Sequence, residues 1–274
     1  MVFFETFDTL RKFADTLNKR EVNPTFKTSE YGLTSQVEGS LEKYGTENFS
    51  EATNLLLNGD NANLSKLKSV NIKSISHSND YIKNMLKAEK SVCGCLPNIP
   101  LYLIGAPNNM LNFKRVPQKS RILNLVVNAS VDYRITVNQI AEAGSNIASI
   151  IKELEKNKIR VNLYIACFVK SKDDYIGTLI NIKKSSSPLN MLNIAYPLIN
   201  PSMLRRHFTR YIETVPVEIN KRFTRGYGSP ISFKTMLERE PKLNKFKDAI
   251  VIDVQNMIGA SVSDMVKTIS ERTK

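Results

Sequence analysis

Basic and aromatic side chains alternate in one region of the sequence, and together they could bind phosphate and stack on bases. Residues 205–247 hold 11 Lys or Arg against 4 Glu, and KRFTRGYG (221–228) sets its arginines beside two aromatic rings. Arginine binds phosphate through paired hydrogen bonds, and aromatic rings stack on unpaired bases. The candidate binding residues are Arg205, Arg206, Arg210, Lys221, Arg222, Phe223, Arg225 and Tyr227. Because the pattern matches no established nucleic-acid-binding motif, two alternatives remain: a solvated loop whose arginines pair with acidic neighbours, and a surface for a protein partner.

A second polar group follows the first strongly apolar segment of the C-terminal half. Asn128, Ser130 and Asp132 come at or directly after residues 121–128 (RILNLVVN), which are typical of a central strand buried on both faces. A hard cation such as Mg²⁺ is held mostly by anionic oxygen and water, so a neutral amide at the first position weakens binding. Asp132 and Asp253 are the carboxylates that could compensate. We expect no cofactor, with Mg²⁺ as the alternative, and we expect Asn128 and Ser130 to cap the turn after the strand.

Catalytic motifs do not follow the predicted strands. No GxSxG, HExxH, Walker-type loop or GxGxxG is found there. His77 and His207 lie far apart, and His207 is expected to be a partly exposed polar residue on a basic helix. Cys93 and Cys95 with His77 would make a poor zinc set, because CxC spacing strains chelation and a fourth ligand is missing. We therefore expect a protein that is not an enzyme.

The composition is that of a globular protein with a strong positive charge. The 274 residues are 42% hydrophobic and 24% charged, with a formal net charge of +13. This excludes a peptide-scale scaffold and wholesale disorder, and the charge favours a polyanion, although a lysine-rich proteome would also produce it. No apolar stretch approaches the roughly 18 residues that span a bilayer, and Glu5 and Asp8 stand where a secretory signal has cations. With three cysteines and no even disulfide framework, we expect a cytoplasmic protein without membrane contact.

Alternating strand and helix patterns from residue 121 onward predict a layered sheet. Thr136 and Gln139 form a capping box before an amphipathic helix, in which Gly144 is expected to allow close approach to the sheet. The strand at 175–183 should run antiparallel to the one before it, because a turn at 170–174 is too short for a crossover. Strands are predicted at 121–128, 159–169, 175–183, 215–219 and 249–254, and helices at 189–198, at 201–214 and from Ser261 or Ser263. The fold class is therefore α/β: a doubly wound, mostly parallel sheet with one antiparallel edge strand.

Three regions are predicted along the chain. Residues 1–96 read as a helical N-terminal region, residues 97–120 as a connector rich in Pro and Gly with one short strand at 101–104, and residues 121–274 as the α/β domain. Within the connector, Met110 and Phe113 either pack against the sheet domain or face a partner.

The strand order and the segment NASVD (128–132) after the first strand resemble a von Willebrand factor A-like domain. In that family the first strand ends in DxSxS, whose carboxylate and hydroxyls hold a divalent cation; here Asn128 replaces the carboxylate, Ser130 keeps one hydroxyl and Asp132 replaces the second serine. Further segments are similar to an uncharacterised family of phage proteins built on this fold: GAPNNM (105–110), RILNLVVNAS (121–130), IKELE (151–155), SPLNML (187–192) and NPSMLRR (200–206).

The resemblance implies a phage or mobile-element protein and carries no activity. We expect a non-enzymatic protein that uses a von Willebrand A-like domain with a degenerate metal site to bind another macromolecule, most simply a protein. The alternatives are a nucleic-acid-binding protein acting through residues 205–247 and a virion structural protein. The host-cell cytoplasm is the expected location, with the virion as the alternative, and the sequence does not predict an oligomeric state.

Overall fold

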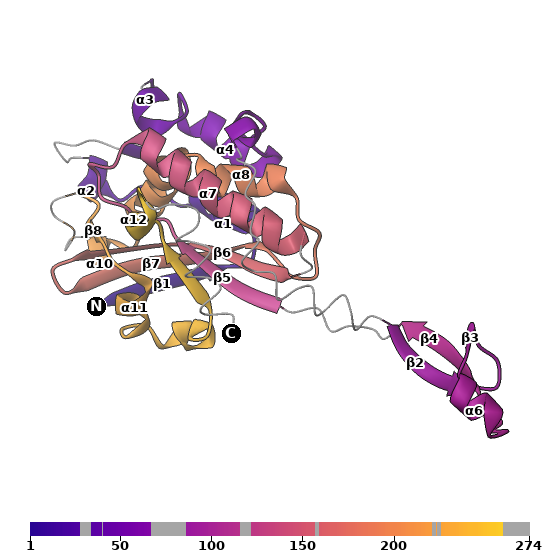
Figure 1. Ribbon diagram of the computed structural model, residues 1–274. Coiled ribbons are helices and arrows are strands. Elements are labelled where there is room, and N and C mark those ends of the chain that lie inside the picture. Colours follow the sequence, from indigo (N-terminus) through magenta and orange to yellow (C-terminus); the bar gives the residue numbers. More distant parts are fainter. Residues whose placement is uncertain are drawn as a thin grey trace. The chain divides into compact units, whose positions relative to one another are not determined.

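The computed structural model describes residues 1–27, 34–39, 41–66, 86–115, 122–156, 159–220, 223 and 226–259 (Figure 1). The chain divides into two compact units. Unit 1 combines residues 1–71 with residues 122–274, and unit 2 is residues 72–121. Among the described residues, no helix combines the length and the apolar character that crossing a membrane requires.

Unit 1 is an α/β unit around one mostly parallel sheet. Its strands are β1 (Val2–Phe7), β5 (Ile122–Asn128), β6 (Arg160–Ser171), β7 (Asp174–Lys183), β8 (Ser229–Pro230) and β9 (Ile250–Asp253). They lie in the order β1-β7-β6-β5-β9, with β8 paired to the end of β6. β5 runs parallel to β6 and β9, β1 runs parallel to β7, and the β6–β7 hairpin is antiparallel. The predicted α/β class and the antiparallel hairpin are confirmed.

The prediction of an antiparallel edge strand is wrong in one respect, because β7 is not at the edge. β1 pairs with it along its whole length, from Val2 opposite Tyr175 to Phe7 opposite Ile180. The start of the chain therefore belongs to the sheet and not to a separate helical region. The six residues VFFETF bury Phe4 toward one face, while Phe3 and Phe7 pack against the core on the other.

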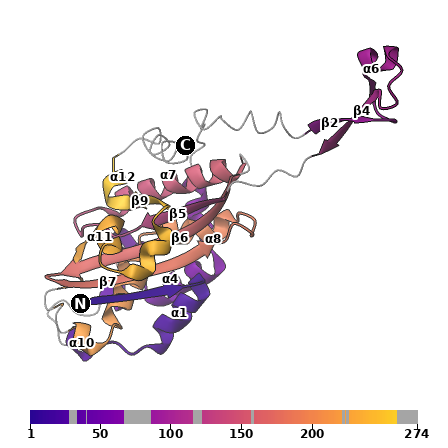
Figure 2. The same cartoon turned by 90° about the horizontal axis from the view of Figure 1, so that it is seen from below.

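The two faces of this sheet carry different layers (Figures 1 and 2). Phe13, Leu17, Ile165 and Ile176 belong to the core on the upper face, and Val126, Phe168, Leu179 and Phe246 to the core on the lower face. The upper layer contains α1 (Leu10–Lys19), α4 (Phe49–Asn58), α7 (Val137–Lys156), α8 (Met191–Ile199), a π-helical turn (Met203–Phe208) and α9 (Thr209–Glu213). The lower layer consists of α11 (Phe233–Leu237) and the short 3₁₀ helix η5 (Pro241–Phe246).

Helix α7 begins with the predicted capping box. Gln139 N donates to Thr136 Oγ1 at 3.3 Å, and Thr136 N donates to Gln139 Oε1 at 2.9 Å. Gly144 was predicted to allow close approach of this helix to the sheet, and this prediction is wrong about the element that α7 approaches. A Cβ at Gly144 would lie 1.8 Å from the carbonyl oxygen of Leu198, so the close approach is to α8 and not to the sheet.

Two further predictions concern segments after the hairpin. The strand predicted at 215–219 is wrong: this segment contains the helical turn α10 (Val217–Asn220). The helix predicted from Ser261 or Ser263 lies outside the described residues. The shorter elements α2 (Pro24–Lys27), η1 (Thr34–Gln36), α3 (Leu41–Tyr44), η2 (Ala62–Lys66) and α12 (Val254–Met257) complete the described part of unit 1.

Unit 2 contains a three-stranded antiparallel sheet in the order β2-β4-β3, with a short helix. Its elements are β2 (Leu86–Ser91), β3 (Leu96–Pro97), α6 (Ile99–Leu103) and β4 (Met110–Arg115). The predicted boundary at 96 falls inside this unit, because Leu86 pairs with Arg115 and Ser91 with Met110 across it, whereas the predicted boundary at 120 lies one residue from the end of unit 2. The strand predicted at 101–104 is wrong: Asn98 caps a helix there by accepting from Leu101 N at 3.4 Å.

Candidate functional site

The edge predicted as a degenerate metal site is closed by hydrogen bonds. Asn128, at the end of β5, stands opposite Asp253, at the end of β9. Its Nδ2 donates to Asp253 Oδ1 at 2.7 Å and to the Ile231 carbonyl at 2.8 Å, and its Oδ1 accepts from Ser130 N at 3.3 Å. The amide therefore presents its donors to the neighbouring carboxylate, where a metal ligand would present oxygen.

The other two residues of that edge also have partners of their own. Ser130 Oγ accepts from Phe168 N at 2.6 Å. Asp132 Oδ1 accepts from Arg134 N at 3.0 Å and from Arg134 Nε at 3.1 Å, and these bonds hold the pKa of Asp132 below its usual value. Within the described ranges, no cluster of three or more His, Cys, Asp or Glu could hold a metal ion. His77 lies outside those ranges, and Cys93 and Cys95 are exposed free thiols.

Arg206, predicted to bind a polyanion, is part of the core. Its side chain is 0% exposed and lies over the ring of Tyr44, 4.8 Å from the ring centroid. The guanidinium donates to Thr46 Oγ1 at 2.8 Å, to the Thr46 carbonyl at 2.7 Å, and to the carbonyls of Ser35 and Val37. A side chain without solvent access cannot contact phosphate, so this assignment is corrected.

The neighbours of Arg206 are also held inside unit 1. Arg205 is half-buried and donates to the carbonyls of Lys43 and Ile135. Arg210 is half-buried over the ring of Phe49, and its Nε and Nη1 have no hydrogen-bond partner among the described residues. His207, expected to be partly exposed, is fully buried; burial lowers its pKa to about 3, and Tyr196 OH lies 2.9 Å from its Nδ1.

The aromatic residues of this region pack inward around a buried carboxylate. Tyr227 OH donates to Glu213 Oε1 at 2.6 Å, and Ser35 donates to the same carboxylate through its N and its Oγ. Burial raises the pKa of Glu213, and Phe223 is 3% exposed. Lys221, Arg222 and Arg225 lie outside the described residues. Phe223 and Tyr227 therefore stabilise the fold, and neither presents a free ring for stacking.

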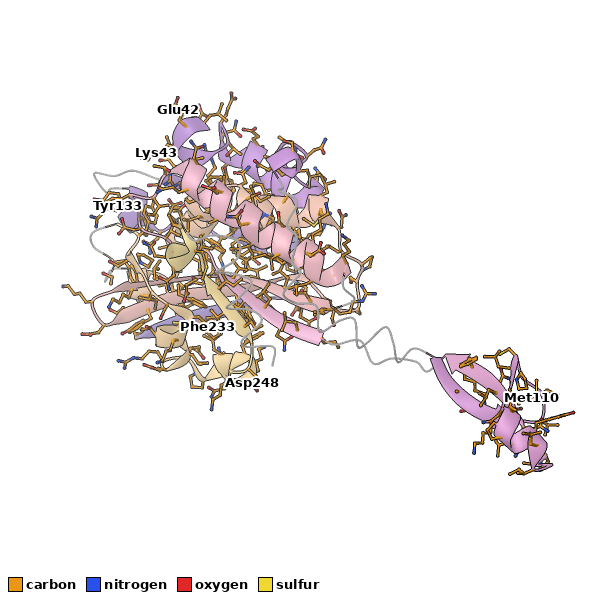
Figure 3. All side chains as sticks on the ribbon, viewed as in Figure 1. Glu42, Lys43, Met110, Tyr133, Phe233 and Asp248 are labelled. Atoms are coloured by element: carbon orange, nitrogen blue, oxygen red, sulfur yellow. The ribbon has the colours of Figure 1, made fainter. Side chains whose placement is uncertain are left out.

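Exposed basic side chains gather instead in the second half of the predicted basic region, on the lower layer. We call this set the basic layer; it consists of Lys234, Arg239, Lys242, Lys245 and Lys247. Glu238 and Asp248 are the exposed acids there, whereas Glu240 is buried and accepts from Lys242 N at 3.1 Å. In Figure 3, the labels of Phe233 and Asp248 mark this layer.

An open groove of about 480 Å³ lies beside η5, on the sheet face that the lower layer packs against. Its floor is formed by side chains from four neighbouring strands: Thr6 of β1, Asn181 of β7, Asn162 and Tyr164 of β6, and Asn124 of β5. Because side chains alternate along a strand, these residues continue the rows that begin with apolar side chains under the lower layer. We call this hollow the asparagine groove.

Two lysines flank the asparagine groove. Lys245 stands on η5 next to Phe246, and Lys184 stands on the loop between β7 and α8; both are exposed. The pKa of Asp8, at one end of the groove, is lowered first by its hydrogen bond from Lys12, and also by the charges of Lys184 and Lys245. Lys184, Lys245 and Asp8 all line the groove, so the lining carries two ammonium groups and one carboxylate.

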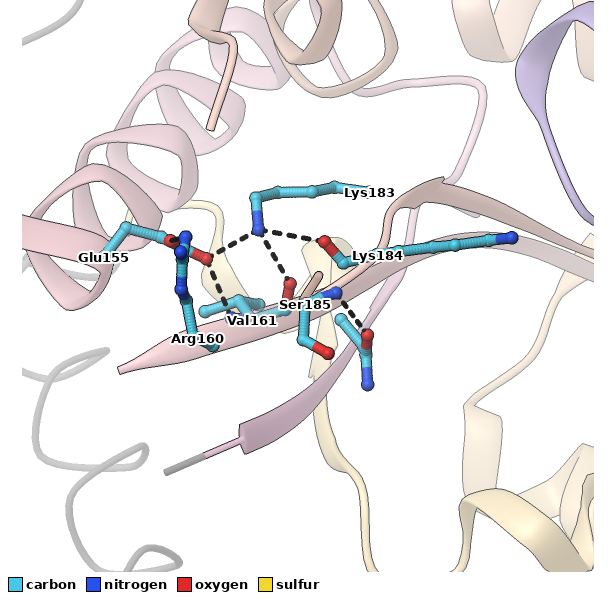
Figure 4. Close-up of polar contacts among 7 residues, drawn as sticks. Glu155, Arg160, Val161, Lys183, Lys184 and Ser185 are labelled. Carbon is cyan, nitrogen blue, oxygen red and sulfur yellow. Dashed lines mark hydrogen bonds and ion pairs between the residues drawn. The ribbon is translucent and has the colours of Figure 1, made fainter. Parts of the chain in front are cut away.

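A buried ion pair fixes the loop that carries Lys184 (Figure 4). Lys183 Nζ donates to Glu155 Oε1 at 2.7 Å and to the carbonyls of Val161 and Lys184 at 3.2 Å each. Lys183 and Glu155 are almost fully buried, with side chains 4% and 7% exposed. Figure 4 shows the Lys183 ammonium pointing toward Glu155 while the Lys184 side chain extends the opposite way. The Lys184 ammonium therefore takes no part in the ion pair, and its side chain lines the groove.

The amides on the groove floor have unused hydrogen-bonding capacity. Asn162 Oδ1 accepts from Ser185 N at 2.6 Å, and Asn162 Nδ2 donates to Asn124 Oδ1 at 2.8 Å. Within the described part of the chain, the Asn124 amino group and the whole Asn181 amide make no hydrogen bond. The described lining residues include one carboxylate and neither histidine nor cysteine, so they supply hydrogen bonds and positive charge and no acid–base pair.

The sequence contained a signal for this groove that single-residue motifs did not reveal. Each of three strands has one asparagine inside an otherwise apolar run: RILNLVV (121–127), VNLYIA (161–166) and TLINI (178–182). Asparagine is depleted in strands, so three such interruptions in neighbouring strands indicate a shared role.

No curated protein and no solved structure is significantly similar to the chain. A family model described as a domain of unknown function, DUF7192, matches residues 1–272, which is nearly the whole sequence. The chain therefore belongs to the DUF7192 family.

Proposed function

We propose that the protein is a nucleic-acid-binding protein, and not an enzyme, that holds the phosphate backbone of a single strand on its basic layer. The observation that carries this proposal is the set of five exposed basic side chains between Lys234 and Lys247, one of which, Lys245, lines an open groove. Lys and Arg supply most of the affinity for a phosphate backbone by releasing its counterions. The net charge of +13 acts in the same direction over longer distances.

The proposal includes a von Willebrand A-like scaffold without a working metal site. The strand order β7-β6-β5-β9 with an antiparallel β7 supports this likeness, as does the bond between Asn128 and Asp253 at the edge where that family binds its cation. An origin in a phage or mobile element and a place in the host cytoplasm belong to the same proposal. The free thiols of Cys93, Cys95 and Cys167 support a reducing compartment.

A charge-reversal variant tests the proposal. In Lys234→Glu/Lys242→Glu/Lys247→Glu, we expect the affinity for a fluorescein-labelled 12-nucleotide single strand to fall about 100-fold at 0.1 M salt. The dependence of log K on log salt should flatten by about 2, since each lost phosphate contact removes about 0.7 from the slope. Fluorescence anisotropy across a salt series measures both quantities.

A matched variant on the upper layer controls for net charge. Lys19→Glu/Lys43→Glu/Lys152→Glu changes three exposed lysines of α1, α3 and α7 and lowers the net charge by the same amount. We expect it to keep most of the affinity and the slope of the wild type. Equal losses in the two variants, or wild-type binding that does not weaken with salt, would overturn the proposal.

A second candidate function is binding of another protein, and unit 2 favours it. Several large apolar side chains of its helix α6 and the residue that follows are open to solvent: Ile99 is 63% exposed, Tyr102 66%, and Leu103 and Ile104 76% each. Exposed apolar side chains gathered in this way mark protein interaction sites.

A further inference from the structure

Two of the three asparagines of the groove floor stand at one level of the sheet, and the third stands two residues further along β6. Asn124 is directly opposite Asn162 in the β5–β6 pairing, and Asn181 is opposite Tyr164 in the β6–β7 pairing. Threonine would suit these half-exposed strand positions better, because β-branched residues are enriched in strands and asparagine is depleted. The asparagines therefore lower the stability of the strands locally. Recognition of a ligand by their amides would explain why they are present despite this loss of stability.

Hydrogen bonds orient two of these amides, those of Asn162 and Asn124. Ser185 N donates to Asn162 Oδ1, and Asn162 Nδ2 donates to Asn124 Oδ1, so the chain of bonds leaves the Asn124 amino group as a donor without a described partner. Ser185 follows the loop that Lys183 fixes through Glu155. Asn181 adds a complete amide, with one acceptor and two donor hydrogens, that no described residue engages.

We propose that the asparagine groove holds the base of one unpaired nucleotide, whose edge is recognised by the amides of Asn124 and Asn181 and whose phosphates lie at Lys184 and Lys245. This inference rests on the proposed function and deepens it, because it adds base selection to backbone binding. The volume of about 480 Å³ is in the usual range for sites that bind small ligands.

The chemistry of the groove favours a nucleotide over other ligands. An asparagine amide pairs with adjacent donor and acceptor groups on a base edge, as in its two-bond contact with adenine. Tyr164 and Phe246 meet edge to face, with centroids 4.8 Å apart, and supply an apolar wall for the base. Two exposed lysines in the groove lining suit phosphate, whereas a neutral sugar would gain nothing from them. A concave floor reaches only a base that is not already paired.

Base preference is the measurement that tests this inference. Fluorescein-labelled dA, dC and dT 12-mers are titrated with the wild-type protein and with Asn124→Thr/Asn181→Thr, and binding is followed by anisotropy. We expect the wild type to favour one homopolymer by about tenfold, the scale of a good amide–base contact. The variant should bind all three with the affinity of the weakest and should keep the salt slope, since the basic layer is intact. Threonine suits a strand, so the variant should fold, and circular dichroism checks this.

A control variant and a second kind of ligand sharpen the test. Asn244→Thr changes an exposed asparagine of η5 that does not line the groove, and it should keep the wild-type preference. The inference is overturned if the wild type binds the three homopolymers equally, if Asn124→Thr/Asn181→Thr keeps the preference, or if uncharged cellohexaose occupies the groove instead. Any of these outcomes could still be accompanied by a large loss of affinity in Lys234→Glu/Lys242→Glu/Lys247→Glu. In that case base recognition in the groove would be excluded while the proposed backbone binding would stand, so the two failures are distinguishable.

Discussion

The guanidinium of Arg206 donates four hydrogen bonds inside unit 1, and His207 next to it contacts Tyr196 and Thr53. Both residues have types that often bind ligands at surfaces. Here they stabilise the π-helical turn against the segments around Ser35 and Thr46. Removing one partner of such a buried charged group leaves the others unsatisfied, which commonly costs about 3–5 kcal/mol. Residue type therefore indicates function only together with burial.

The buried imidazole of His207 makes stability depend on pH. Burial lowers its pKa to about 3, whereas an unfolded chain protonates histidine near pH 6.5. The unfolded state therefore gains a proton that the folded state does not take up, so stability is full above about pH 6.5 and falls by about 1.4 kcal/mol per pH unit below it, down to about pH 3. Between pH 7 and pH 5, we expect the wild type to lose about 2 kcal/mol more unfolding free energy than His207→Gln, measured by urea titration.

Glutamine keeps a hydrogen-bonding group near Tyr196 but does not titrate, so the comparison isolates the imidazole. Equal losses in the two proteins between pH 7 and pH 5 would show that His207 is accessible to protons in the folded state.

At the residue scale, several residues that the sequence predicted for the candidate site pack against the rest of unit 1. Arg205, Arg206, Phe223 and Tyr227 were selected by type and local density, but the exposed face of their segment is set by its packing against residues more than 150 positions away, such as Ser35 and Thr46. Such contacts leave no local signal. Asn124 interrupts an apolar run in the sequence. Its place in a groove could be recognised only from the folded sheet, in which Asn162 pairs with it and Asn181 lines the same groove.

At the element scale, Gly144 sets the distance between α7 and α8. An added Cβ would lie 1.8 Å from the Leu198 carbonyl oxygen and 2.7 Å from its carbon, both of them backbone atoms that cannot turn aside. Alanine would favour an isolated helix by about 1 kcal/mol, but overpacking typically costs about 1–3 kcal/mol and more where backbone must move. We expect Gly144→Ala to lower the unfolding free energy by about 2 kcal/mol or more in urea titrations.

Asn138→Ala provides the control on the same helix, because Asn138 is exposed in the first turn of α7. It should leave stability unchanged or slightly raised. If Gly144→Ala proved as stable as the wild type, α7 and α8 would be free to separate, which their close backbone approach argues against.

The elements that the sequence predicted well are those with a strong local pattern. β5, β6, β7 and β9 are apolar runs, and α7 has both a capping box and a long apolar face. β1 was missed because six residues ahead of a clear helix carry little periodicity, and their partner β7 follows more than 150 residues later. β2, with the sequence LKAEKS, alternates apolar and polar residues over only its first four positions, so its pairing with β4 is what defines it.

At the scale of the whole molecule, each of the two units carries one of the candidate binding surfaces. The lower layer of unit 1 carries the basic layer beside the asparagine groove, and unit 2 carries the exposed apolar residues of α6. The net charge of +13 predicted a polyanion partner without indicating which surface would meet it. The location had to come from the fold, because it depends on which lysines and arginines the packing leaves outside.

The stability of unit 1 should not depend on unit 2. Every residue of unit 2 whose burial is described is exposed or half-buried, whereas the buried apolar residues of the described chain all belong to unit 1. Since stability comes mainly from buried apolar surface, replacing residues 72–121 by a glycine–serine linker should shift the thermal midpoint by less than about 3 °C, the shift that about 1 kcal/mol produces in a protein of this size. Affinity for single strands should be retained, because the basic layer belongs to unit 1. A much lower midpoint would mean that unit 2 buries surface of unit 1, and lost affinity would move the nucleic-acid contact away from the basic layer.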